Sequence, residues 1–136
     1  MDYRNHIAEG SMLNTPPVFA VYVCMLNLRW LKAEGGVPEM EKRNNVKAEL
    51  LYNAIDESEI FKGTVAKEDR SKMNACFIMD DPEKEKEFLN YTRQLGIVGI
   101  KGHRSVGGFR ASLYNALTRN SVEVLVQAMK DFENGL

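Results

Sequence analysis

The sequence is poor in cysteine, histidine and long apolar runs, and each shortage excludes a class of protein. Cys24 and Cys76 lie in separate apolar segments, which favours buried, reduced thiols in a cytoplasmic protein over a disulfide framework. His6 has neither a cysteine nor a second histidine nearby at metal-ligand spacing, so we expect no metal site there. The longest apolar run, Val18 to Leu26, has nine residues. A membrane span needs about 20, so we expect none.

The sequence also lacks an excess of charge of either sign. Its 136 residues carry 18 basic and 19 acidic side chains, a formal net charge of −1. This balance provides no general attraction to nucleic acid or to an acidic membrane, so we expect neither as a partner. Any anion-binding site must therefore be local. The first ten residues carry charges of both signs where a secretory signal would need an apolar stretch, which again favours the cytoplasm.

The periodicity predicts a two-layer α/β domain with the element order ααββαββα and helices on one face of a small mixed or antiparallel sheet. Residues 1–13 show no clear period and are expected to be a loop or a strand. The expected helices cover about residues 17–34, 38–56, 82–94 and 121–132, and the expected strands cover 60–65, 72–79, 97–100 and 109–113.

The first two expected helices differ in surface chemistry. The first half of helix 17–34 is apolar on every side, so we infer that another domain or subunit covers part of it. Helix 38–56 has one apolar side and one charged side that includes Lys47, which we expect to be solvated. Met25, Trp30, Phe77 and Phe88 are most simply core residues.

Residues 101–110, KGHRSVGGFR, contain the strongest chemical signal. Three glycines permit a tight turn, and Lys101, His103, Arg104 and Arg110 stand among them without a carboxylate. The loop is either a solvated basic hairpin or a site for a phosphate or carboxylate, to which arginine offers paired donors. It is not a phosphate-binding P-loop, because Gly108 and Phe109 stand where Lys and Ser/Thr are required.

A second candidate site lies at Asn14-Thr15-Pro16-Pro17, where a helix begins. Asn14 or Thr15 either caps this helix or binds an anion through its side chain, because the two prolines lack N–H groups.

Three segments together closely resemble the phosphoserine aminotransferase family: NTPP at 14–17, VAKEDRSKMN at 65–74 and KGHRSVGGFRASLYNA at 101–116. The resemblance covers essentially the whole chain but only the C-terminal part of the family's proteins. It implies that residues 1–13 are a lead-in from a preceding large domain, and that residues 14–136 form the small C-terminal domain of a fold-type I, class V aminotransferase.

The resemblance also implies a function. Family members are homodimers that use pyridoxal 5′-phosphate to transfer the amino group of glutamate to 3-phosphohydroxypyruvate in serine biosynthesis, and some bacterial members also serve pyridoxine biosynthesis. Asn14 and Thr15 match positions that reach the cofactor phosphate across the dimer interface. His103 and Arg104 match the pair that holds the substrate phosphate, and Arg110 matches the arginine that binds the substrate α-carboxylate.

No catalytic residue is expected in this chain, because the lysine that forms a Schiff base with the cofactor lies upstream of the matched segments. The chain alone is therefore expected to be inactive. An alternative is a free-standing module that binds a phosphoserine-like anion without catalysis. Another class V enzyme, such as a cysteine desulfurase, is disfavoured because its substrate offers no phosphate to His103 and Arg104.

Overall fold

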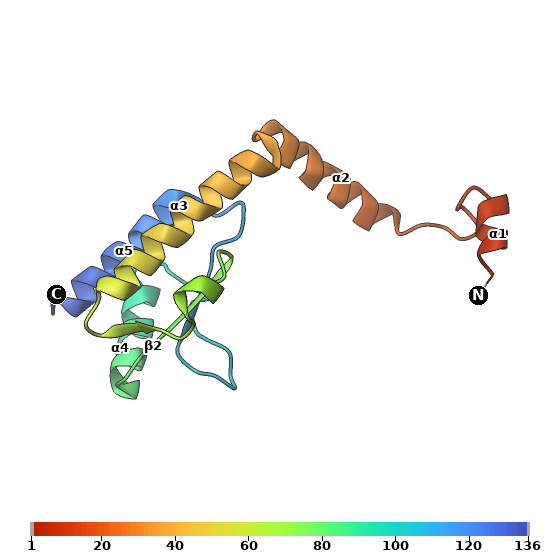
Figure 1. Ribbon diagram of the computed structural model, residues 1–136. Helices are drawn as coiled ribbons and strands as arrows, with labels where there is room; N and C mark the ends of the chain where they lie inside the picture. The colour runs from red at the N-terminus through yellow and green to blue at the C-terminus, as the bar shows by residue number, and fades with distance from the viewer. Residues whose placement is uncertain (1, 136) are drawn as a thin grey trace. The chain divides into compact units, whose positions relative to one another are not determined.

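The computed structural model describes residues 2–135, which divide into two compact units between Glu39 and Met40. The first unit contains helices α1 (Tyr3–Ala8) and α2 (Val18–Ala33). Helix α3 (Gly36–Glu57) begins at the boundary and belongs mainly to the second unit. The remaining elements follow in the order β1 (Phe61–Gly63), the short 3-10 helix η1 (Lys67–Asp69), β2 (Asn74–Met79), α4 (Pro82–Gln94), β3 (Phe109–Ser112) and α5 (Arg119–Glu133) (Figure 1).

Helix α4 begins at the predicted residue, and α5 begins two residues before its predicted start; each has a side-chain cap. The Asp81 side chain accepts a hydrogen bond from the Glu83 amide and precedes Pro82 at the first helical position. The Thr118 hydroxyl accepts one from the Ser121 amide and starts α5. Gly96, with φ 77°, follows the end of α4 in the left-handed conformation that glycine adopts readily.

The three strands form one antiparallel sheet in the order β1-β2-β3. Phe61 pairs with Met79, and Phe77 pairs with Phe109, so alternate residues of all three strands face the same side. That side is buried against side chains from α3, α4 and α5, and Figure 1 shows α3 and α5 on the same side of the strands. The predicted two-layer α/β architecture is confirmed.

Aromatic rings fill the centre of this core. Phe61 makes edge contacts with Phe77, Phe88 and Phe109, at centroid distances of 5.8, 4.9 and 6.2 Å. Phe77 and Phe109 stack across the β2–β3 pair at 5.0 Å. Since each of these four side chains is at most 1% exposed, they join the sheet to α4 in one packed cluster.

The prediction of a strand at 97–100 is wrong. Residues 97–100 belong to no strand of the described structure; next to β3 the Ile100 carbonyl accepts from the Arg110 amide, and Lys101 and Phe109 form an isolated bridge. Gly99 has φ 79°, a left-handed conformation that interrupts an extended ladder. Ile100 is nevertheless buried, so the apolar residues of this segment reflect core packing from a loop.

The expectation of a loop or strand over residues 1–13 is also wrong in part, because Tyr3–Ala8 form a short helix. The Asp2 carboxylate accepts a hydrogen bond from the Arg4 amide and pairs with its guanidinium. No residue of this six-residue helix is buried, so the helix needs no apolar face, and its sequence shows no helical apolar period.

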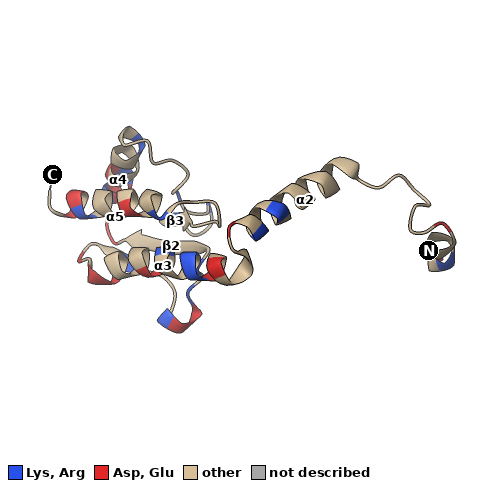
Figure 2. Cartoon of the chain, turned by 90° about the horizontal axis from the view of Figure 1, so that it is seen from above, with Lys and Arg blue, Asp and Glu red and all other residues tan. Residues whose placement is uncertain are grey.

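Helix α2 is apolar but has no buried residue. Figure 2 shows most of it without charge, with Lys and Arg only towards its C-terminal end. Cys24 and Trp30 are exposed and Met25 is half-buried, so the prediction that these side chains are buried is wrong. Cys76, on β2, was also expected to be buried and is half-buried. Among the residues that the structure describes, no helix is long and apolar enough to cross a membrane.

Candidate functional site

The loop between Lys101 and Arg110 is closed by its own backbone. The Gly102 amide donates to the Gly108 carbonyl at 2.8 Å, and the Val106 and Gly107 amides both donate to the His103 carbonyl. A side chain at Gly102 would place its Cβ 2.0 Å from the Gly107 oxygen, so only glycine permits this closure. The glycines therefore build a compact hairpin rather than an open basic loop.

The cations of this hairpin face water without acidic partners. Lys101, His103, Arg104 and Arg110 are exposed, and within residues 2–135 no ion pair involves Lys101, Arg104 or Arg110. Two guanidinium groups and an ammonium on one short hairpin attract anions, and arginine binds phosphate or carboxylate through paired N–H donors.

Arg110 lies on the open face of the sheet. Its neighbours Phe109 and Ala111 are buried, and alternation along β3 turns Arg110 to the opposite side. Its backbone is fixed on both sides, because its amide donates to the Ile100 carbonyl at 2.7 Å and its Cα is paired with that of Cys76. Among the cations of the hairpin, Arg110 is therefore the one whose backbone lies in a strand.

His103 is oriented locally by Ser105. The His103 Nδ1 atom and the Ser105 hydroxyl oxygen lie 2.8 Å apart, and the Ser105 amide donates to the same nitrogen at 3.3 Å. These contacts use Nδ1 and leave Nε2 available for a ligand.

Asn14 and Thr15 lie in the first unit, whereas the hairpin lies in the second. Neither side chain caps α2: Pro17 occupies the capping position, and the helix has no side-chain capping bond. Both residues are exposed, so the capping interpretation of this motif is wrong and their polar groups remain available for an anion.

Residues 65–74, for which the sequence predicts no role of their own, contain part of an ion-pair network. Both guanidinium Nη atoms of Arg70 bind the Asp56 carboxylate, at 2.7 and 2.9 Å, and Lys67 lies 2.8 Å from the same group. The hydrogen bonds from Arg70 and Lys67 lower the pKa of Asp56 from 3.8 to about 2. Arg70 also lies over the ring of Tyr52, 4.6 Å from its centroid. This network ties the chain before β2 to α3.

Lys47 is the largest departure from the predicted surface. We expected it on the solvated side of helix 38–56, but its residue is 2% exposed. Its Nζ atom donates to the carbonyls of Leu113, Tyr114 and Leu117 at 3.1, 2.8 and 3.1 Å. Burial lowers the pKa of this ammonium group. The sequence gives no sign of this burial, because Lys47 is one of several charged residues on the same helix.

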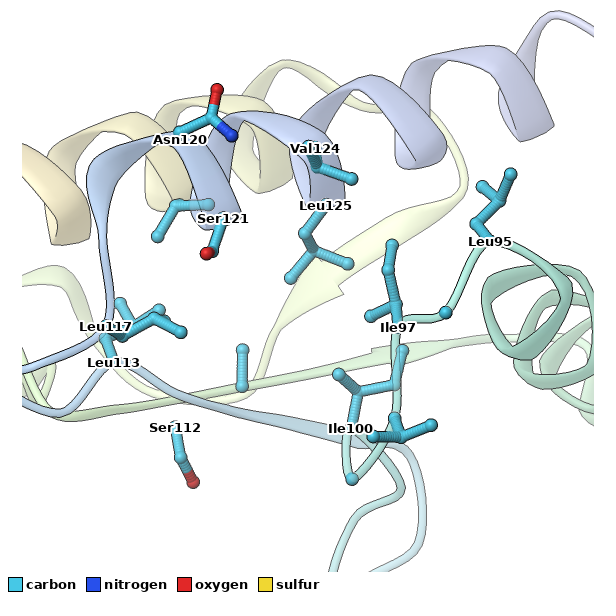
Figure 3. A pocket seen from close by; sticks show the side chains of 15 residues that line it. Leu95, Ile97, Ile100, Ser112, Leu113, Leu117, Asn120, Ser121, Val124 and Leu125 are labelled. Atoms are coloured by element: carbon cyan, nitrogen blue, oxygen red, sulfur yellow. The ribbon is translucent and has the colours of Figure 1, made fainter.

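A cavity of about 400 Å³ lies beside the hairpin. Its lining contains no charged residue, and Figure 3 shows Leu125 of α5 and Ile97 pointing toward one another. Within the described part of the chain, no cluster of three or more potential ligands (His, Cys, Asp or Glu) could hold a metal ion.

Comparison with known proteins decides the family. The model of the class-V aminotransferase family, described as "Aminotransferase class-V", matches residues 2–125. The chain belongs to this family. It is 56% identical over 135 residues to a phosphoserine aminotransferase of Bacteroides thetaiotaomicron, and 59% identical over 135 residues to one of Porphyromonas gingivalis.

Solved structures agree with these relatives. A phosphoserine aminotransferase from Bacillus circulans subsp. alkalophilus matches with a TM-score of 0.90 and 43% identity, over 98% of this chain and 37% of its own. A PLP-bound phosphoserine aminotransferase from Trichomonas vaginalis matches with a TM-score of 0.84 and 40% identity, over 95% and 37%. The match to each of the two bacterial relatives covers 98% of this chain and 38% of the relative, in its C-terminal part.

Proposed function

We propose that this chain is the substrate-binding, C-terminal part of a phosphoserine aminotransferase. The reaction is transfer of the amino group of glutamate to 3-phosphohydroxypyruvate, giving phosphoserine and 2-oxoglutarate. The observation that carries this proposal is the glycine-closed hairpin, whose arginines are exposed without acidic partners in the described structure. A substrate with a phosphate at one end and a carboxylate at the other needs cations at two points, and this hairpin supplies them.

Each site residue has a role in this proposal. Arg110, held on β3, binds the α-carboxylate through its paired donors. His103 and Arg104, at the tip of the hairpin, bind the phosphate, with Nε2 of His103 as a donor. Two fixed ends orient the substrate so that its reacting carbon is presented at one place.

The cofactor of the proposed enzyme is pyridoxal 5′-phosphate. The residues present fit its phosphate group, because the side chains of Asn14 and Thr15 are exposed and cap no helix. The two prolines that follow offer no backbone N–H groups, so these side chains would be the donors to the phosphate. When bound, the cofactor supplies the electron sink for transamination. We propose that the lysine that holds it lies in the part of the enzyme preceding these residues, and that this chain supplies no catalytic residue.

The proposed assembly is a cytoplasmic homodimer in which residues 1–13 lead in from a large domain and residues 14–136 form the small domain. The large hydrophobic side chains exposed on α2 support an assembly of this kind. We propose that the large domain or the partner subunit covers this helix.

A second candidate is an anion-binding module without catalysis. Residues 40–136 favour it, because they have a core of their own and carry the hairpin. Calorimetry on the 136-residue chain separates the two: micromolar binding of phosphoserine supports the module, and no detectable binding supports the aminotransferase part.

The aminotransferase is tested by joining this chain to the preceding part of the Bacteroides thetaiotaomicron relative. We expect Arg110→Lys to lower kcat/KM by at least about 30-fold, since lysine lacks paired donors and losing a close charged contact costs about 2–5 kcal/mol. The exposed Lys42→Arg change is the matched control and should have no effect. Wild-type turnover in Arg110→Lys would sink the assignment.

A further inference from the structure

Lys47 makes contacts that a lysine rarely makes. Its three ammonium protons are all used, because Nζ donates to the carbonyls of Leu113, Tyr114 and Leu117. No ion pair accompanies it among residues 2–135. Lysine is almost never fully buried without a charged partner. An apolar side chain of similar length fills the same space without desolvating a charge, so packing alone does not explain this residue.

Two of the three carbonyls that Lys47 binds, those of Leu113 and Leu117, accept no backbone hydrogen bond in the described chain. Of the three, only Tyr114 accepts a backbone hydrogen bond elsewhere in the described chain, from the Leu117 amide at 2.9 Å. Leu113 is itself buried, and its carbonyl would otherwise lack a partner from the protein. One ammonium group therefore donates hydrogen bonds to three carbonyls of the turn 113–117 and holds them close together.

A second α3 side chain binds the same turn. Asn44 lies one helical turn before Lys47 on the same face, and its amide donates to the side-chain oxygen of Asn115 at 2.8 Å. Helix α3 thus holds the turn through four hydrogen bonds from two side chains.

This turn begins directly after β3, the strand that carries Arg110. Leu113 lies three residues beyond Arg110, which is about 10 Å along an extended strand. The Leu113 amide also donates to the Met73 carbonyl at 2.7 Å, so α3 and the residue directly before β2 both bind the chain at the end of β3. A shift of this end along the strand would carry Arg110 with it.

We propose that Lys47 is a positioning residue that sets the place of Arg110 through the turn 113–117. The inference rests on the proposed function, in which Arg110 binds the substrate carboxylate. A cation is required at this point because only an ammonium group offers three donors from one atom to three converging carbonyls. Lys47 itself does not touch the substrate.

The test uses the joined full-length enzyme, with Lys47→Met as the variant that keeps length and loses donors. Lys42→Met, at an exposed position of the same helix, is the matched control. We expect Lys47→Met to raise KM for the phosphorylated keto acid about tenfold or more, since displacement of a positioning group by about 1 Å has large effects. The absorbance of the bound cofactor should not change, and the control should behave as wild type.

A double-mutant cycle with Arg110→Gln separates positioning from general stability. If Lys47 acts through Arg110, Lys47→Met has no further effect on KM once Arg110 is replaced. Independent, additive effects in the double variant overturn the inference. So does a wild-type KM in Lys47→Met while Arg110→Gln raises it. If Arg110→Gln itself leaves KM unchanged, the proposed function fails, which is a different result. If Lys47→Met does not fold, Lys47→Gln is measured in the same cycle.

Discussion

The ion pair between Asp56 and Arg70 should make the stability of the second unit depend on acid in a defined pH window. Asp56→Asn removes the negative charge with little change in shape, while Arg70 and its contact with Tyr52 remain. Because the pKa of Asp56 is lowered in the folded protein, its carboxylate adds stability above pH 3.8, and that stability is lost as the pH falls through about 2.

The size of the effect follows from the pKa values. A pKa lowered from 3.8 to about 2 corresponds to an upper bound of about 2.5 kcal/mol at neutral pH, since one pKa unit is about 1.4 kcal/mol. The Asp56 side chain is 25% exposed and Lys67 is 75% exposed, so water screens part of this interaction. We therefore expect Asp56→Asn to lower the free energy of unfolding by about 1.5 kcal/mol at pH 7 and by about half of that at pH 3.

Urea denaturation of the 136-residue chain and its variant at pH 7, 4 and 3 measures this difference directly. Lys67→Gln is the matched control, because it removes the more exposed partner of the same carboxylate and should cost less than about 0.5 kcal/mol. A loss for Asp56→Asn that stays the same at pH 7 and pH 3 would show that the carboxylate is not stabilised by its charge, and would refute the reasoning.

Two further substitutions probe the hairpin and the core. Gly102→Ala places a methyl group 2.0 Å from the Gly107 oxygen, so in the joined enzyme we expect weaker substrate binding with unchanged circular dichroism; wild-type KM contradicts this. Phe88→Ala empties the centre of the aromatic cluster and should cost about 3–5 kcal/mol in chemical denaturation. A loss below about 1 kcal/mol would mean that the cluster is not the core.

Sequence reasoning succeeded where a local signal determines structure. The expected helix 82–94 matches α4, because its signals are local: Asp81 and Pro82 mark its start and Gly96 follows its end, and capping and left-handed glycine act within a few residues. It failed at Ile97 and Ile100, whose apolar side chains fit a strand or a packed loop equally well. Gly99 decided between them through its φ angle of 79°.

The site shows the same division. The cations of residues 101–110 could be found from their composition, since no acid stands among them. Lys47 could not, because its role depends on a turn 66 to 70 residues away in the sequence. The partner of Arg70, Asp56, is likewise 14 residues away: it lies near the end of α3, and β1 and η1 separate the two in the sequence. Contacts of this kind exist only once the fold has formed.

The charge of this nearly neutral chain is unevenly distributed. Of its 19 acidic side chains, several are paired with cations elsewhere: Asp56 with Arg70, Asp80 with Lys62, and Glu123 with Arg119. Those pairs offset charge at three points of the second unit, while Arg104 and Arg110 have no ion pair within the described residues. On the hairpin, these arginines stand close together in the sequence with no acid among them, an arrangement that favours a compact dianion over an extended polyanion such as nucleic acid.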